Sequence, residues 1–156
     1  MKKNRVAAVL VDRHSFIVFN MLITYVLIAS TVKMAPMLFD AGNYIHALDD
    51  ICDANGTILI AYGVVLEERE SIMRILGVCA GNIDCKIDGL CHDLGVELLV
   101  IGLFMEVVVQ LIKIPNTIVN TDGIEWLLFI FGSVFAVTSA CLIVVNCFKL
   151  TRARLA

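Results

Sequence analysis

A glutamate within a long apolar run is the residue of this sequence with the clearest chemical potential. Glu106 lies inside the apolar residues 94–112, and Gln110 and Lys113 follow it four and seven positions later. On a helix these three side chains share one face. A carboxylate inside a bilayer costs about 2.5–3.5 kcal/mol on insertion scales, so Glu106 is expected to face a bundle interior or a wet cavity. The functional interpretation is a protonatable or ion-coordinating site in a transport path.

An ion pair that fixes helix register is the more conservative interpretation of Glu106. Its candidate partners are Lys113, on the same helix face, and Lys33, which is predicted at a comparable depth at the end of the first apolar run. A second carboxylate, Glu97, precedes Glu106 by nine positions, which is about 180° around a helix. The two carboxylates therefore point to opposite faces and are not predicted to form a catalytic pair.

Three polar residues could form a carboxylate–histidine cluster at the inner membrane surface. If the two middle apolar segments run antiparallel, Glu67 lies level with Glu97, and His92 lies nearby. A charged helix end in contact with headgroups and water explains the same residues more simply. We therefore expect Glu67, Glu97 and His92 to be solvated rather than catalytic.

Acidic residues and a histidine gather before the second apolar segment. On a helix, His46, Asp50 and Asp53 would share one face at i, i+4 and i+7. Carboxylate oxygens with one imidazole could bind a divalent cation. The simpler interpretation is that these residues belong to an acidic outer loop, so any metal at this site stays unknown.

Three cysteines and a histidine form a C-x5-C-x5-C-H pattern. These residues are Cys79, Cys85, Cys91 and His92. Thiols and imidazole are zinc ligands, but structural zinc sites usually have closer cysteine spacings. These residues are therefore only a weak candidate for a metal site, and the segment that contains them resembles an ordinary loop between two helices.

The signatures of common enzyme classes are missing from the sequence. It contains no Walker A loop, no HExxH, no GxSxG and no ExxH pair of the kind that builds di-iron bundles. We expect no enzyme activity and no cofactor.

The composition places these residues in a membrane protein. Of 156 residues, 60% are hydrophobic, and the mean hydropathy is +0.90; an ordinary soluble domain is about 45–50% apolar. A chain this short cannot hide the surplus from water, so a lipid bilayer is the expected solvent. The net charge of −3 argues against nucleic acid as a partner. The expected location is the plasma (inner) membrane of a bacterium.

Four apolar segments must position the candidate residues. Two are clear, residues 16–32 and 124–148, and two are weaker, residues 51–66 and 94–112. The alternative to four spans keeps the clear pair and makes the weaker pair re-entrant or interfacial. The segments predict an all-α integral membrane protein, a four-transmembrane-helix bundle forming one domain over residues 1–156, with helices at about 15–35, 47–76, 94–113 and 123–148.

Positive charges predict the orientation of this bundle. Lysines and arginines precede the first segment, follow the last and occur in the central connection, whereas residues 40–55 and 114–123 contain none. Cytoplasmic loops carry the excess of Lys and Arg. Both termini are therefore expected in the cytoplasm.

Small residues predict how the helices meet. Gly56 and Gly63 are seven positions apart, and so are Gly95 and Gly102. Membrane helices associate through close backbone approach at such positions, so the matched spacing favours packing at these glycines. A further small-residue stripe on the last helix consists of Gly132, Ala136 and Ala140.

Two functions remain open at this point. The first is a non-enzymatic accessory or scaffolding subunit, with other membrane-protein subunits as partners, which small size and missing catalytic motifs favour. The second is a homo-oligomeric channel or transporter for an ion, proton or small solute that uses Glu106. We favour the first.

Overall fold

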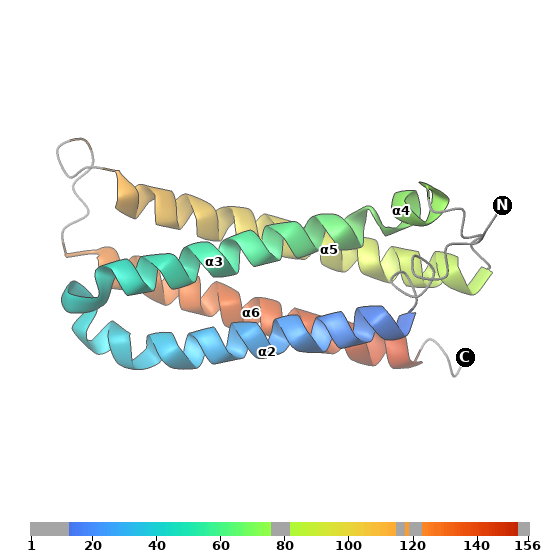
Figure 1. Cartoon of the computed structure of the whole chain (residues 1–156), viewed down its shortest axis with the longest axis horizontal. Coiled ribbons are helices and arrows are strands. Elements are labelled where there is room, and N and C mark those ends of the chain that lie inside the picture. Colours follow the sequence, from blue (N-terminus) through green and yellow to red (C-terminus); the bar gives the residue numbers. More distant parts are fainter. Residues whose placement is uncertain (1–12, 76–81, 115–117, 119–122, 153–156) are drawn as a thin grey trace.

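Four long helices dominate the structure, a computed structural model that describes residues 13–75, 82–114, 118 and 123–152. Its elements are α2 (Arg13–Met37), the short 3-10 helix η1 (Leu38–Asp40), α3 (Ala41–Glu67), α4 (Arg69–Ile75), α5 (Asn82–Lys113) and α6 (Glu125–Arg152). The described residues contain helices and no strand. The long helices lie side by side in two layers, α3 with α5 and α2 with α6 (Figure 1).

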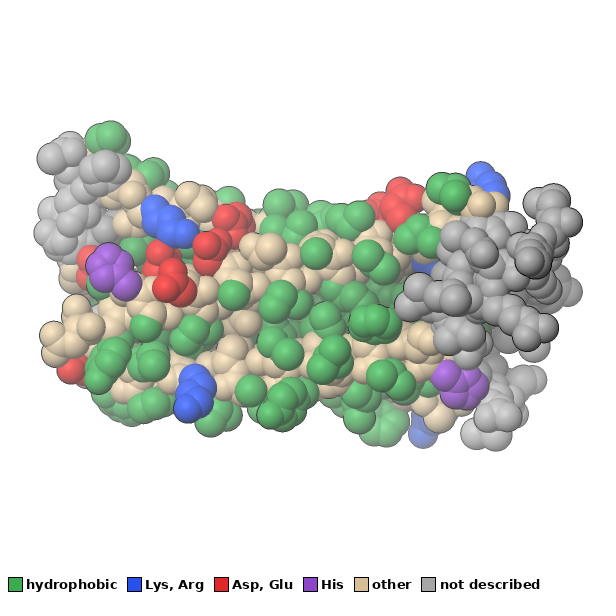
Figure 2. Space-filling view, in the orientation of Figure 1, with side chains coloured by type: hydrophobic (Ala, Val, Ile, Leu, Met, Phe, Trp, Pro, Cys, Tyr) green, Lys and Arg blue, Asp and Glu red, His purple; other side chains and the backbone are tan. Residues whose placement is uncertain are grey.

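Three stretches are long and apolar enough to cross a membrane within the described residues. They are His14–Asp40, Ile87–Lys113 and Glu125–Arg152. α3 does not qualify, because its longest uncharged run is residues 54–66, between Asp53 and Glu67, and a span needs about 20 apolar residues. Hydrophobic side chains cover the middle of the face in Figure 2, and most charged ones lie toward its two ends. The chain is therefore a helical, membrane-like protein with three candidate spans.

Two expected helix boundaries are wrong. Residues 47–76 do not form one helix, because α3 ends at Glu67, Glu68 forms a turn, and α4 begins at Arg69. After this break, α4 points Arg69 and Met73 into the bundle. The third long helix begins at Asn82 rather than near residue 94. Ile87, Cys91 and Leu94 are buried at helical spacing ahead of Leu98, so the buried stripe of the helix continues into a polar stretch that hydropathy alone marks as a connection.

Each long helix buries one stripe of side chains. On α3 the buried positions recur at alternating spacings of four and three, the heptad pattern of left-handed bundles. They are Leu48, Cys52, Asn55, Leu59, Tyr62 and Leu66. Leucines from three helices, Leu27, Leu59 and Leu98, are fully buried in one core cluster. This stripe pattern, rather than membrane hydropathy, keeps α3 in the bundle.

Four glycines hold α3 and α5 at backbone contact; we call Gly56, Gly63, Gly95 and Gly102 the glycine seam. A Cβ atom added at Gly63 would lie 2.7 Å from the carbonyl oxygen of Gly95, and one added at Gly102 would lie 2.9 Å from that of Gly56. A Cβ at Gly95 would lie 2.6 Å from the backbone nitrogen of Glu67. No side chain fits at such distances, so the close packing predicted from the glycine spacing is confirmed.

The small residues of α6 are also buried. A Cβ atom added at Gly132 would lie 2.9 Å from Sγ of Cys52, so this glycine lets α6 approach α3. Ala136 and Ala140 lie in the main core cluster. The predicted small-residue stripe therefore packs inside the bundle.

Candidate functional site

An ion cluster closes one end of the glycine seam, near the start of α3 and the end of α5. Nζ of Lys113 lies 3.1 Å from Oδ2 of Asp53 and 3.6 Å from Oδ2 of Asp49. Asp49, Asp53 and Gly56 follow one another at spacings of four and three, which puts all three on the face of α3 that meets α5. The Asp49 side chain is 13% exposed and that of Lys113 is 39% exposed. Figure 2 shows acidic and basic side chains gathered over this end of the two helices.

Glu106 lies farther along the same seam, toward the middle of the bundle. Its backbone nitrogen is 3.5 Å from the position of a Cβ atom at Gly56. Nε2 of Gln110 donates a hydrogen bond to Oε1 of Glu106 at 2.9 Å. Oε2 of Glu106 is buried and has no hydrogen-bond partner among the described residues. The structure thus brings Glu106 and Gln110 together, one turn apart on α5.

Neither lysine is paired with Glu106. Lys113 bonds across the seam to Asp53 and Asp49 instead, because these aspartates lie opposite the last turn of α5, while Glu106 is two turns away along the helix axis. Lys33 is exposed on α2 and forms no ion pair within the described ranges. The interpretation of Glu106 as one half of an ion pair is therefore wrong.

The candidate metal ligands near the start of α3 do not surround a common point where a metal ion could bind. His46 and Asp50 are exposed, and Asp53 is paired with Lys113. No group of three His, Cys, Asp or Glu side chains in the described part of the chain could hold a metal ion.

The cysteine pattern is divided between the core and the surface. Cys91 is buried in the main core cluster, whereas its neighbour His92 is exposed. Adjacent residues on a helix point about 100° apart, so this pair cannot face one ligand. Cys79 lies outside the described residues, and Cys85 lies on α5 with a side chain that is not described.

The candidate carboxylate–histidine cluster of Glu67, Glu97 and His92 is not assembled. Glu97 and His92 are exposed, and Glu67 is half-buried, with its backbone against Gly95. The buried charge at this end is Arg69 instead, with a side chain only 3% exposed. Arg69 pairs with Asp88 of α5, and its guanidinium lies 5.3 Å from the centre of the Phe16 ring of α2.

Sequence reasoning missed Arg69 as a core residue, although a signal was present. Asn55, Tyr62 and Arg69 follow one another at intervals of seven, and all three are buried on one stripe. A buried guanidinium needs a carboxylate partner and polar or aromatic contacts, which Asp88 and Phe16 supply. This arrangement ties α4 to α5 and α2.

Buried asparagines form further links between the helices. Nδ2 of Asn55 donates to Oγ of Ser30 at 2.9 Å, joining α3 to α2. Tyr62 donates from its hydroxyl to Oδ1 of Asn20 at 2.5 Å, and Nδ2 of Asn146 donates to the backbone carbonyl of Leu90 at 2.9 Å. Asn20 and Asn146 are amide side chains within the two clearest apolar runs, residues 16–32 and 124–148. A polar amide in such a run is a signal from which an interhelical contact could have been predicted.

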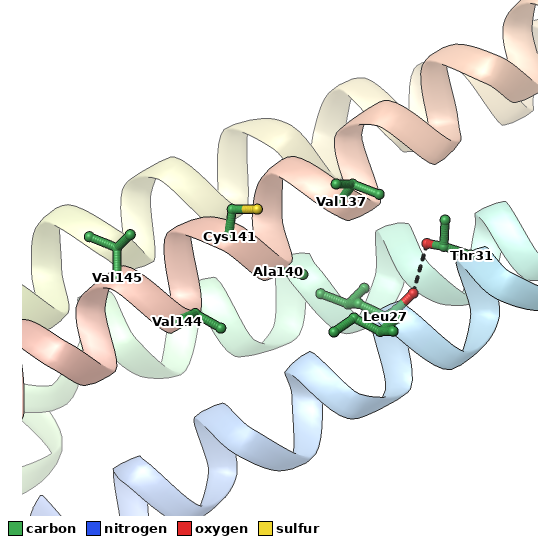
Figure 3. A pocket seen from close by; sticks show the side chains of 8 residues that line it. Leu27, Thr31, Val137, Ala140, Cys141, Val144 and Val145 are labelled. Carbon is green, nitrogen blue, oxygen red and sulfur yellow. Dashed lines mark hydrogen bonds between the residues drawn. The ribbon is translucent and has the colours of Figure 1, made fainter.

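A shallow apolar groove of about 320 Å³ lies between α2 and α6. Its lining residues are Leu27, Ile28, Thr31, Val137, Ala140, Cys141, Val144 and Val145. The hydroxyl of Thr31 donates to the carbonyl oxygen of Leu27 at 2.8 Å, as Figure 3 shows, so its donor is already satisfied. The groove therefore offers shape but little polar chemistry.

Comparison of the chain with protein-family models, with curated proteins and with solved structures finds no match.

Proposed function

We propose that all four long helices cross the bilayer and that the protein is a non-catalytic accessory or scaffolding subunit of a membrane assembly. A span for α3 is supported by its position: it runs beside α5 along the glycine seam and bonds to α2 through Asn55 and Tyr62. Because neighbouring helices cover much of its surface, α3 needs less apolar character than a lipid-facing helix. α2 begins and α6 ends at the same end of the bundle (Figure 1), as four spans with both termini in the cytoplasm require.

The proposal depends mainly on one observation: the buried polar side chains bond to other helices rather than converge on a common site. Asn55, Tyr62 and Asn146 each bond to a neighbouring helix. The rest of the core is apolar and includes the leucines Leu27, Leu59 and Leu98. Polar groups used in this way specify helix register and stability. A structural protein needs such groups, whereas an enzyme needs reactive groups that converge on a substrate.

Native mass spectrometry of the protein, extracted from its own membrane in mild detergent, tests the proposal. The expected result is a complex with other polypeptides at a fixed stoichiometry, the same in two different detergents. A homo-oligomer or a monomer alone, under conditions that preserve known membrane complexes, would contradict an accessory role.

A homo-oligomeric channel or transporter is the second candidate, and one observation favours it. Oε2 of Glu106 is buried without a partner among the described residues, and an unpaired intramembrane carboxylate is a common feature of ion and proton pathways. The test is flux into vesicles that contain the purified protein. A pathway through Glu106 predicts that Glu106→Gln abolishes flux with the oligomer intact, while Glu97→Gln, an exposed carboxylate on the same helix, leaves flux unchanged.

A further inference from the structure

The shallow groove between α2 and α6 lies on two helices that are each long and apolar enough to cross a membrane. On α6, Val137, Cys141 and Val145 line it at intervals of four residues, as Figure 3 shows. All three side chains are exposed. In a bilayer such a surface is covered by hydrocarbon, so acyl chains are the groups available to fill the groove.

The described lining of the groove has no strong hydrogen-bond donor left for an occupant. Thr31 carries the only hydroxyl among the lining residues, and this hydroxyl donates to the carbonyl oxygen of Leu27 in its own helix at 2.8 Å. Cys141 contributes a thiol, which is only a weak donor. A polar occupant would gain little for the hydrogen bonds to water that it gives up. The groove therefore fits a hydrocarbon chain.

A helix from another polypeptide fits the same groove less well. Membrane helices associate where small residues let their backbones approach closely. Ala140 is only 5% exposed and already packs in the main core cluster, while the branched side chains of Ile28 and Val145 are exposed in the lining. These branched side chains hold a rigid helix away from the backbone, whereas a flexible chain can follow their surface.

Two basic residues follow the groove on the same face of α6. Lys149 and Arg152 come four and seven positions after Val145, a spacing that returns to one helix face. Both side chains are exposed, and neither forms an ion pair within the described part of the chain. Two unpaired cations next to an apolar groove are complementary in charge to an amphiphile with an anionic head and a hydrocarbon tail.

The distance between the basic residues and the groove matches one leaflet of a bilayer. The hydrocarbon of one leaflet is about 15 Å thick, which corresponds to about ten residues of helix. Ala140, Cys141 and Val145, which line the groove on α6, all lie within ten residues of Lys149. A phospholipid with its phosphate at Lys149 can therefore place an acyl chain in the groove without leaving its leaflet.

We propose that the groove between α2 and α6 binds one acyl chain of an anionic phospholipid whose phosphate contacts Lys149 and Arg152. The acyl chain packs against the apolar lining, and the phosphate accepts hydrogen bonds from the ammonium group of Lys149 and the guanidinium group of Arg152. The inference rests on the proposed crossing of the bilayer by α2 and α6. It does not depend on an accessory role, which the stoichiometry of polypeptides tests separately.

The direct test is native mass spectrometry of the unmodified protein, freed of its own lipid and mixed in mild detergent with equal amounts of phosphatidylglycerol and phosphatidylcholine. The expected result is one phospholipid bound to each chain, with phosphatidylglycerol preferred at least about fivefold, since a basic residue at the membrane surface contributes about that factor. Equal binding of the two lipids, or no lipid retained by the protein, overturns the proposal. Because no substitution is involved, the result does not depend on how variants fold.

Variants of the basic residues test the contact with the phosphate. The double variant Lys149→Gln, Arg152→Gln should lose the preference for phosphatidylglycerol and bind phosphatidylcholine as before. Lys33→Gln is the matched control, because Lys33 is an exposed lysine of α2 that lies outside the groove, and it should keep the preference. A preference that survives in the double variant would show that the phosphate lies elsewhere.

A substitution that fills the groove tests the position of the acyl chain. Val145→Trp should reduce the binding of both lipids several-fold, because the indole ring occupies the space of the chain. Val100→Trp is the matched control: Val100 lies on α5 outside the groove and is 43% exposed, close to the 49% of Val145, and this variant should bind both lipids normally. Equal lipid binding by the two tryptophan variants would place the acyl chain outside the groove and contradict the proposal.

Discussion

The two layers of the bundle are closed by opposite means. In the α3–α5 layer, four glycines bring backbones into contact, so no space remains between the helices. In the α2–α6 layer, a groove of about 320 Å³ remains open between the helices, lined by residues that include Leu27, Val137 and Val144. Lipid gives no hydrophobic drive for helix association, so packing quality sets how tightly helices bind. The difference predicts a rigid layer and a compliant layer in one molecule.

The largest effect should come from a side chain placed in the glycine seam. Gly95→Leu puts its Cβ atom 2.6 Å from the backbone of Glu67, so α3 and α5 must separate. We expect a loss of about 3 kcal/mol in unfolding free energy, at the upper end of the range for overpacking. Thermal or denaturant unfolding in detergent measures it.

Gly89 provides the matched control on the same helix. A Cβ atom added there meets nothing within 4 Å, and alanine is favoured over glycine in helices by about 1 kcal/mol. Gly89→Ala should therefore be neutral or stabilising. Equal destabilisation by Gly95→Leu and Gly89→Ala would show that the seam is not the rigid layer.

A smaller effect is expected at the ion cluster that closes the Lys113 end of the seam. Lys113→Met leaves the carboxylates of Asp49 and Asp53 close together without their cation. The unfolding midpoint should fall at low ionic strength, by less than in Gly95→Leu. Because the lysine is substantially exposed, salt screens the interaction, and the difference from the unmodified protein should shrink at high ionic strength. A loss that does not depend on salt would mean that packing, rather than charge, closes the seam.

The smallest effect is expected in the groove of the α2–α6 layer. Cys141 is exposed at the groove, so Cys141→Leu adds volume where lipid already makes contact. We expect a change in unfolding free energy within about 0.5 kcal/mol, as for most surface substitutions. A strong destabilisation by Cys141→Leu would remove the contrast between the two layers.

The helix packing could be predicted from the sequence more fully than the contacts of the candidate site. The spacing of Gly56, Gly63, Gly95 and Gly102 is local information, since seven residues return to the same helix face whatever the rest of the chain does. The buried stripe of α3 follows from the same periodicity. These features could therefore be predicted without any knowledge of which helices are neighbours.

The partners of charged residues could not be predicted in the same way. Whether Lys113 reaches Asp49 and Asp53 depends on how far α3 is displaced along α5, and the glycine contacts between the two helices fix that displacement. Glu106, on the same helix as Lys113, lies two turns away whatever the position of α3. The turn at Glu68 could not be predicted either, because the surrounding residues are good helix formers and the buried spacing continues unchanged through Leu66, Arg69 and Met73. Such outcomes are properties of the assembled bundle.

The glycine seam also limits how the chain can change in length. Gly56 meets Gly102 and Gly63 meets Gly95, so both contacts form only while the two intervals of seven residues stay equal. One residue inserted between Gly56 and Gly63 would rotate one glycine about 100° away from its partner. The number of residues that connect α4 to α5 does not enter these two intervals, so a change in the length of that connection leaves both glycine contacts in register. Insertions and deletions inside either glycine interval should therefore disrupt the seam, whereas those outside the intervals should not. This is a constraint on the length of the chain rather than on residue type.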